Sequence, residues 1–168
     1  MKKGDKGLKV AVYPGSFDPV TLGHLDIIHR ASGIFDKLVV AVLVNSSKNP
    51  LFSLEERIDL LREVTQDLPN VEIDGFQDLL IHYMQSKQAN VIVRALRSVS
   101  DYEYELQLAS LNRQIGAGVE TLFMTSNPKY SYLSSSIVKE IARYHGPVQD
   151  LVPAPVEREL HIKYRRKG

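Results

Sequence analysis

Residues 10–24 read VAVYPGSFDPVTLGH, and this stretch decides how the rest of the chain is interpreted. An apolar run typical of a strand ends at Pro14-Gly15, and Gly23-His24 follows where apolar residues begin to recur at helical spacing. This pattern predicts a strand, a tight turn and a helix. A helix start favours an anion such as phosphate, because its amides are free and it is the positive end of the helix dipole. His24 lies at such a helix start.

The same alternation continues along the whole chain. Residues 38–44 form an unbroken apolar run, which is typical of a parallel strand covered on both faces. Ser53 and Glu56 have the spacing of a capping box at the start of a helix. The pattern predicts strands at 8–13, 38–44, 71–75, 90–95 and 120–125, with helices at 22–35, 53–65, 78–87, 98–115, 134–144 and from Pro155 onward.

Five such units without a break in composition predict one doubly wound (Rossmann-like) α/β domain over residues 1–168. We expect a five-stranded parallel sheet with helices on both faces. Residues 1–7 are interpreted as a frayed tail without the features of a signal peptide, and 161–168 as a basic, solvated tail.

Composition excludes several classes of function. The chain has no cysteine, which removes disulfides, thiolate catalysis and cysteine-bound metals. Its net charge of +1 gives no overall field for nucleic acid or an anionic membrane, so neither is expected as a partner. The longest apolar run is far shorter than the roughly 20 residues of a membrane helix. His24 and His29 lie about 140° apart around one helix, so no metal site is expected. A cytoplasmic location fits these features.

The fold class predicts where a ligand binds, because open parallel sheets bind ligands beyond the carboxyl ends of their strands. Polar and basic residues gather at the ends of the predicted strands, namely in 14–17, 45–48, 75–77, 94–97 and 126–136. We therefore expect one site at this edge of the sheet.

Each candidate also has an ordinary structural interpretation. Ser16 after Gly15 suits either phosphate binding or a routine turn, and His24 suits either phosphate binding or helix capping. Lys48 lies in a loop and is either a ligand or a solvated side chain. The serines 134–136 offer amides and hydroxyls to an anion, or simply cap a helix.

The two arginines at the end of the fourth strand are open to the same choice. Arg94 and Arg97 have the spacing to clamp anionic groups. They also have the spacing to pair with Asp101, Glu103 or Glu105 as an ordinary salt-bridge network.

Several ordered motifs resemble one family. Residues 13–19 (YPGSFDP) with Thr21-Leu-Gly-His24 resemble the first motif of the nucleotidylyltransferase superfamily, T/H-x-G-H. Residues 47–48, 54–57 (LEER), 94–97 (RALR), 101–105 (DYEYE) and 134–140 (SSSIVKE) narrow the resemblance to bacterial phosphopantetheine adenylyltransferase. The resemblance spans roughly residues 8 to 160.

This resemblance implies transfer of the adenylyl group of ATP to 4′-phosphopantetheine, giving dephospho-coenzyme A and pyrophosphate. It implies that His24 stabilises the transition state, and that Lys48 and Arg94 grip the acceptor together with Ser16 and Leu80. It assigns to the ATP site Ser16, Phe17, His24, Ala95, Leu96, Arg97, Glu105, Tyr130, Ser131, Tyr132, Leu133, Ser134, Ser135 and Ser136. Mg²⁺ is implied as an ion carried by ATP.

The implied chemistry suits these residues, because a phosphomonoester oxygen attacks without a general base and needs only alignment and charge neutralisation. Attack is expected in line, without a covalent intermediate. Two residues depart from the family: Ala95 stands where glycine is usual and adds a methyl group, and Ser16 replaces a commoner threonine. Neither change removes a charge.

The resemblance also implies a homohexamer with coenzyme A as a feedback ligand. Two alternatives stay open at this point. One is a sister enzyme that adenylylates nicotinate mononucleotide or cytidylylates a sugar or glycerol phosphate. The other is a nucleotide sensor without catalytic activity.

Overall fold

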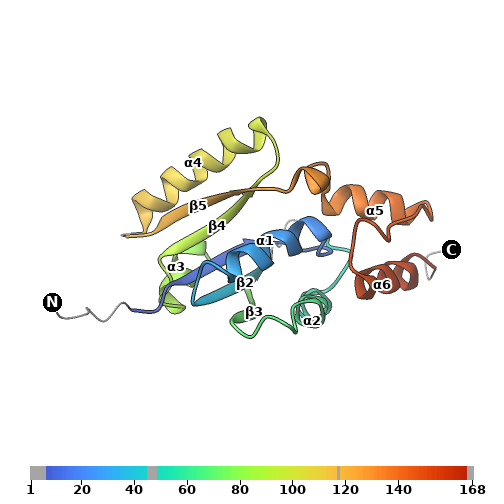
Figure 1. The fold of residues 1–168 in the computed structure, drawn as a ribbon, viewed down its shortest axis with the longest axis horizontal. Coiled ribbons are helices and arrows are strands. Elements are labelled where there is room, and N and C mark those ends of the chain that lie inside the picture. Colours follow the sequence, from blue (N-terminus) through green and yellow to red (C-terminus); the bar gives the residue numbers. More distant parts are fainter. Residues whose placement is uncertain (1–6, 45–48, 117, 166–168) are drawn as a thin grey trace.

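Five strands form one parallel sheet in the order β3-β2-β1-β4-β5 (Figure 1). The computed structural model describes residues 7–44, 49–116 and 118–165. The strands are β1 (Val10–Gly15), β2 (Lys37–Leu43), β3 (Val71–Phe76), β4 (Val91–Leu96) and β5 (Glu120–Thr125). The chain runs outward from β1 to β3, then returns to β4 on the other side of β1. The switch in strand order therefore lies between β1 and β4, as the doubly wound prediction requires.

Helices cover both faces of the sheet. They are α1 (Leu22–Ser32), α2 (Leu54–Val64), α3 (Leu80–Ser86), α4 (Val99–Ile115), α5 (Ser135–Arg143) and α6 (Ala154–Arg165). Alternate residues of β1 divide between two cores: Ala11 and Tyr13 pack in the core with α1, α2, α5 and α6, whereas Val12 packs in the core with α3. This alternation is the period of two expected of a strand covered on both faces.

Helix starts follow the polar residues that the sequence places there. The Ser53 hydroxyl accepts the Glu56 amide at 3.2 Å, and the Glu56 carboxylate accepts the Ser53 amide at 2.8 Å, which confirms the capping box. Ser98 and Ser134 cap α4 and α5 by accepting the amides of Asp101 and Ile137. These bonds satisfy amides that would otherwise lack partners.

The fourth helix differs from the others in how little of it is covered. Of its described side chains, only Glu105 is buried, while apolar side chains on it are exposed: Val99, Tyr102, Tyr104, Leu106, Leu111 and Ile115. Figure 1 shows α4 lying over β4 and β5, at the margin of the molecule. The apolar stripe of α4 is therefore a face that the described part of the chain leaves uncovered.

The predicted boundaries are shifted by a few residues. The first strand extends through Pro14 and Gly15, because their backbones still pair with Ala41 and Val42 of β2. The first helix ends at Ser32 with Gly33 as its C-cap, three residues earlier than expected. A short 3₁₀ helix at Pro128–Tyr130 was not predicted.

Candidate active site

A cavity of about 430 Å³ opens at the carboxyl ends of β1 and β4, at the switch point of the sheet. Most of the predicted site residues line it: Ser16, Phe17, His24, Arg94, Ala95, Arg97, Glu105, Tyr130, Leu133, Ser134, Ser135 and Ser136. They come from segments that are up to 120 residues apart in the sequence. The structure therefore brings the predicted strand-end residues together.

The bend after β1 presents Ser16 and buries Phe17. Phe17 has a positive φ of 46°, and its ring lies edge-on to the rings of Tyr13 and His24. A Cβ atom at Gly15 would lie 2.9 Å from the Phe17 ring, so a glycine is needed for the ring to fold back there. Ser16, in contrast, is exposed and lines the cavity.

One nitrogen of His24 is used by the fold. Its Nδ1 accepts the Thr21 amide at 3.0 Å, while the Thr21 hydroxyl accepts the His24 amide, so the two residues form a capping box for α1. An acceptor at Nδ1 places the proton of the neutral ring on Nε2. Burial, and then the positive charge of Arg97, lower the pKa of His24 to about 4. His24 is therefore neutral at pH 7 and has Nε2–H free to donate.

Both arginines are paired, as the alternative interpretation proposed, and both still line the cavity. Arg94 donates through Nε and Nη2 to the two oxygens of Glu105, at 2.6 and 2.5 Å, and through Nη1 to the Pro14 carbonyl. Glu105 is only 8% exposed. Burial acts to lower the pKa of Arg94, but the hydrogen bonds and the negative charge of Glu105 outweigh it. The pKa of Arg94 is therefore raised. Arg97 pairs with Asp101 and donates to the Leu133 carbonyl.

The serines at the start of α5 have separate roles. The Ser134 hydroxyl caps the helix, and the Ser135 hydroxyl donates to the Pro19 carbonyl at 2.8 Å. Ser136 is exposed at the cavity. Tyr130 lies across from α1, and its Cβ atom would be 3.4 Å from a Cβ atom at Gly23. Tyr130 therefore packs closely against Gly23.

Five predicted residues are not part of this cavity as described. Leu96, Ser131 and Tyr132 do not line it. Leu80 lines a small neighbouring cavity of about 40 Å³, which shares Arg94 and Glu105 with the main one. Lys48 lies outside the described residues. The prediction for Leu96 and for residues 131–132 treated whole segments as pocket-lining, although side chains in a strand or turn alternate in direction.

Other cavity residues were not among the predicted site residues. Tyr13, Thr21, Asp101 and Ser126 all line the cavity. Thr21 and Asp101 have a signal in the sequence. Thr21 lies three residues before His24, the spacing of a capping box, and Asp101 lies four residues after Arg97, a spacing that allows an ion pair. Tyr13 is the first residue of the motif at 13–19, but its place in an apolar strand gave no indication that it lines the cavity.

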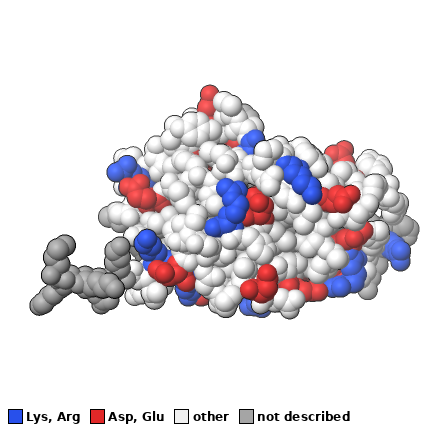
Figure 2. All heavy atoms as spheres, viewed as in Figure 1, with Lys and Arg blue, Asp and Glu red and all other residues white. Residues whose placement is uncertain are grey.

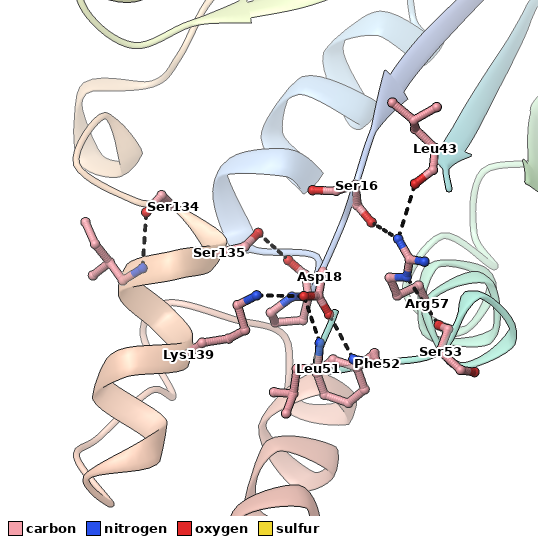
Figure 3. Close-up of polar contacts among 12 residues, drawn as sticks. Ser16, Asp18, Leu43, Leu51, Phe52, Ser53, Arg57, Ser134, Ser135 and Lys139 are labelled. Atoms are coloured by element: carbon pink, nitrogen blue, oxygen red, sulfur yellow. Dashed lines mark hydrogen bonds and ion pairs between the residues drawn. The ribbon is translucent and has the colours of Figure 1, made fainter. Parts of the chain in front are cut away.

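A second cavity of about 640 Å³ adjoins the first and shares Ser16, Ser135 and Ser136 with it. Figure 3 shows two polar centres beside it. Asp18 is only 5% exposed, and it accepts the amides of Leu51 and Phe52 and the Lys139 ammonium at 2.6 Å. Arg57, on the other side, donates to backbone carbonyls.

No group of three His, Asp or Glu side chains suitable for a metal ion occurs among the residues that the structure describes. The carboxylates of Asp18, Asp101 and Glu105 each bond to a cation. Within the described residues these carboxylates are therefore engaged by cationic side chains and do not form a ready set of metal ligands.

Surface charge is mixed. Lysines and arginines alternate with aspartates and glutamates over the face in Figure 2, in line with the net charge of +1. None of the helices in the described ranges is long and apolar enough to cross a membrane.

Comparison with known proteins identifies the family. The cytidylyltransferase-like family model matches residues 12–141. The chain is 54% identical over 159 residues to the phosphopantetheine adenylyltransferase of Caldanaerobacter subterraneus subsp. tengcongensis, covering 95% of this chain and 99% of the relative. The chain belongs to the phosphopantetheine adenylyltransferase family.

Two solved structures share the fold of this member of the phosphopantetheine adenylyltransferase family. A Vibrio parahaemolyticus protein named "Putative Nicotinate-nucleotide Adenylyltransferase" matches with a TM-score of 0.69 and 17% identity, over 94% of this chain and 96% of that one. A lipopolysaccharide core biosynthesis protein from Thermoplasma volcanium matches with a TM-score of 0.57 and 22% identity, over 72% and 99%. At these identities the likeness concerns the fold alone.

Proposed function

We propose that the chain transfers the adenylyl group of ATP to 4′-phosphopantetheine, forming dephospho-coenzyme A and releasing pyrophosphate. The observation that carries the proposal is the full-length, 54% identical relative of that name, combined with a cavity lined by the matching motif residues. The sister-enzyme alternative is disfavoured because the matching relative carries a different name from those enzymes.

The reaction joins two anions, so it depends on alignment and on stabilisation of charge. The acceptor phosphate attacks the α-phosphorus of ATP in line, the bond to the bridging oxygen breaks, and pyrophosphate leaves. His24 donates its Nε2 proton as a hydrogen bond to the α-phosphoryl group. Ser16 contacts both phosphates from the bend after β1. No side chain of the protein forms a covalent intermediate.

Arg94 can reach the acceptor without leaving Glu105. Its guanidinium has five N–H groups, and three of them bond to Glu105 and Pro14, which leaves two (5 − 3) for a substrate phosphate. The bidentate pair fixes the plane of the guanidinium, so these two groups have a set direction. Lys48 is proposed to bind the same phosphate.

The neighbouring small cavity supports a role for Leu80. Its other lining residues include Leu108, Ala109 and Asn112 on α4, and it touches Arg94. At about 40 Å³ the cavity is too small to hold the organic arm of the acceptor, so the support for Leu80 is its place beside Arg94. The adenine and ribose are proposed to occupy the side formed by Ala95, Arg97 and the segment 130–136.

Mg²⁺ is proposed to enter on the phosphates of ATP and, when bound, to neutralise part of their charge. A homohexamer, inhibition by coenzyme A and a cytoplasmic location are further proposals. The uncovered apolar stripe of α4 supports self-association.

The test is a comparison of acceptors. The purified protein is incubated with ATP, Mg²⁺ and either 4′-phosphopantetheine, nicotinate mononucleotide or glycerol 3-phosphate, and pyrophosphate release is measured, with CTP as a second donor. We expect release with ATP and 4′-phosphopantetheine. Release with another pair alone would reject the proposal in favour of a sister enzyme, and ATP binding without turnover of any acceptor would indicate a sensor.

A further inference from the structure

Arg57 carries a positive charge in an unfavourable place. It is the fourth residue of α2, near the positive end of the helix dipole, and it is only 4% exposed. Burying a charged group costs free energy unless it is paired. Within the described ranges of the chain, its hydrogen-bond partners are backbone carbonyls and no carboxylate forms an ion pair with it. The bonds to backbone carbonyls are therefore what offsets the cost of burying this charge.

The guanidinium joins the ends of two strands. The register of β1 with β2 ends at the pair Gly15–Val42, so Ser16 and Leu43 are the first residues beyond it. Arg57 Nη1 donates to the Ser16 carbonyl at 2.9 Å and to the Leu43 carbonyl at 3.4 Å (Figure 3). Its Nε donates to the Ser53 carbonyl at 3.2 Å. The Arg57 side chain therefore bridges β1 and β2 at the point where their backbone pairing ends.

These bonds act on the residue that faces the substrates. In Figure 3 the Ser16 carbonyl points to Arg57, and the Ser16 hydroxyl points the other way. The next residue, Phe17, has a positive φ, and Ser135 holds the Pro19 carbonyl. Within the described structure, Arg57 is the side chain that bonds to Ser16 itself. A shift of its guanidinium would rotate the peptide that carries the hydroxyl.

We propose that Arg57 is a positioning residue for adenylyl transfer: it acts through the carbonyl of Ser16, which it holds so that the hydroxyl meets the reacting phosphates. This inference rests on the proposed function, because it assigns Ser16 to both phosphates. Displacement of an aligned group by about 1 Å is enough to slow a reaction about 10²-fold.

The test is a double-mutant cycle with Arg57→Gln and Ser16→Ala, measured as kcat/KM with ATP and 4′-phosphopantetheine. We expect each single variant to lose about 30- to 100-fold and the double variant to lose little more than the worse single one. Residues that act through one another give such non-additive effects. Arg62→Gln, on the exposed side of the same helix, is the control and keeps wild-type activity.

Thermal unfolding of each variant separates positioning from loss of fold. If Arg57→Gln does not fold, Arg57→Lys replaces it in the cycle, since it keeps the charge but lacks the planar fork. Losses that multiply across the cycle would overturn the role given to Arg57, as would an Arg57 variant with wild-type kcat/KM. A wild-type protein that does not turn over 4′-phosphopantetheine would instead reject the proposed function, and this inference with it.

Discussion

The two nitrogens of the His24 ring have different tasks. Nδ1 closes the capping box with Thr21, and Nε2 keeps the proton that a phosphoryl oxygen can accept as a hydrogen bond. The fold thereby fixes the tautomer that the chemistry needs, without a carboxylate behind the ring. The same residue is a helix cap and a candidate catalytic group, so the two interpretations that the sequence left open are both compatible with the structure.

A glutamine at this position separates the two tasks. His24→Gln keeps a side-chain oxygen that can accept the Thr21 amide, as the capping box S/T-x-x-E/Q requires, but its amide N–H groups are not held where the imidazole ring presents Nε2–H. We expect kcat to fall about 10²- to 10³-fold, the usual effect of removing one transition-state donor, with ATP affinity nearly unchanged. Steady-state kinetics and calorimetry measure both. His29→Gln on the exposed side of α1 is the control, and a kcat near wild type for His24→Gln would refute the role.

The lowered pKa of His24 predicts a dependence of stability on pH. Because the folded pKa, about 4, lies below the ordinary value of 6.5, the unfolded state binds more protons between these values. The contribution is complete above pH 6.5 and is lost as the pH falls toward 4. At pH 4.5 we expect wild type to have lost about 2 to 3 kcal/mol more than His24→Gln, relative to pH 7. Urea denaturation at both pH values checks this, and equal losses in the two proteins would contradict it.

Several arginines near the carboxyl edge of the sheet donate hydrogen bonds to backbone carbonyls. Arg30, Arg57 and Arg94 donate to backbone carbonyls at or next to strand ends. Those carbonyls would otherwise lack partners where the strands separate. Motif matching identified Arg94 and Arg97 as candidate ligands, but it included Arg57 only as the last residue of the motif at 54–57 and gave it no role, because that role depends on the carbonyls of Ser16 and Leu43. That information exists only once the strands are in register.

At the scale of elements, α2 and α6 are joined by two ion pairs of different quality. Lys163 on α6 bonds both oxygens of Glu56, which also caps α2, and this bond lowers the pKa of Glu56. Arg158 on α6 meets Glu63 at 3.5 Å, with both side chains well exposed. The Glu56–Lys163 pair includes a residue that caps α2, whereas the Glu63–Arg158 pair is a long contact between exposed side chains.

The two glutamates therefore make a matched pair of variants. Glu56→Ala removes the cap of the Ser53 amide and is expected to lower the free energy of unfolding by about 1 kcal/mol. Glu63→Ala is expected to cost less than about 0.5 kcal/mol, because exposed ion pairs contribute little. Chemical denaturation of both variants gives the comparison. Equal losses would mean that the capping box adds nothing beyond an ordinary surface pair.

Helices and strands could be predicted from the sequence where a local pattern, such as an apolar run or a capping box, was strong. The apolar run at 38–44 and the Ser53–Glu56 spacing gave a strand and a helix start close to those observed. Boundaries failed where tertiary contacts decide them. Pro14 and Gly15 read as a turn, yet they continue β1 because β2 pairs with their backbones. The 3₁₀ helix at Pro128–Tyr130 is too short to leave a periodic pattern.

At the scale of the molecule, the order of strands explains why the location of the site could be predicted from the sequence but the contacts between its side chains could not. The rule that parallel sheets bind ligands at their carboxyl edge placed Ser16, His24, Arg94 and the serines of α5 in one region, and the cavity contains them. The rule gives no pairing between side chains. The Arg94–Glu105 bond and the separate cavity of Leu80 needed the three-dimensional structure.

The exposed stripe of α4 belongs to the same scale, because it has no partner within the described chain. Tyr104, Leu111 and Ile115 recur at helical spacing and are about half exposed or more. We expect Leu111→Lys to yield smaller assemblies than wild type, since a charge in a buried interface is costly. Ile34→Lys, equally exposed but outside α4, is the control. Light scattering after size exclusion measures the mass, and an unchanged assembly would exclude this stripe as the interface.

The central claim is that residues from separate strand ends form one site for both substrates. Its most direct test is a crystal structure of the protein with a non-hydrolysable ATP analogue and 4′-phosphopantetheine. The account predicts the α-phosphoryl group within hydrogen-bonding distance of His24 Nε2 and Ser16, with the acceptor phosphate at Arg94. Nucleotide bound elsewhere, for example in the hollow between Lys139, Arg143 and Tyr164, with these three residues untouched, would contradict it.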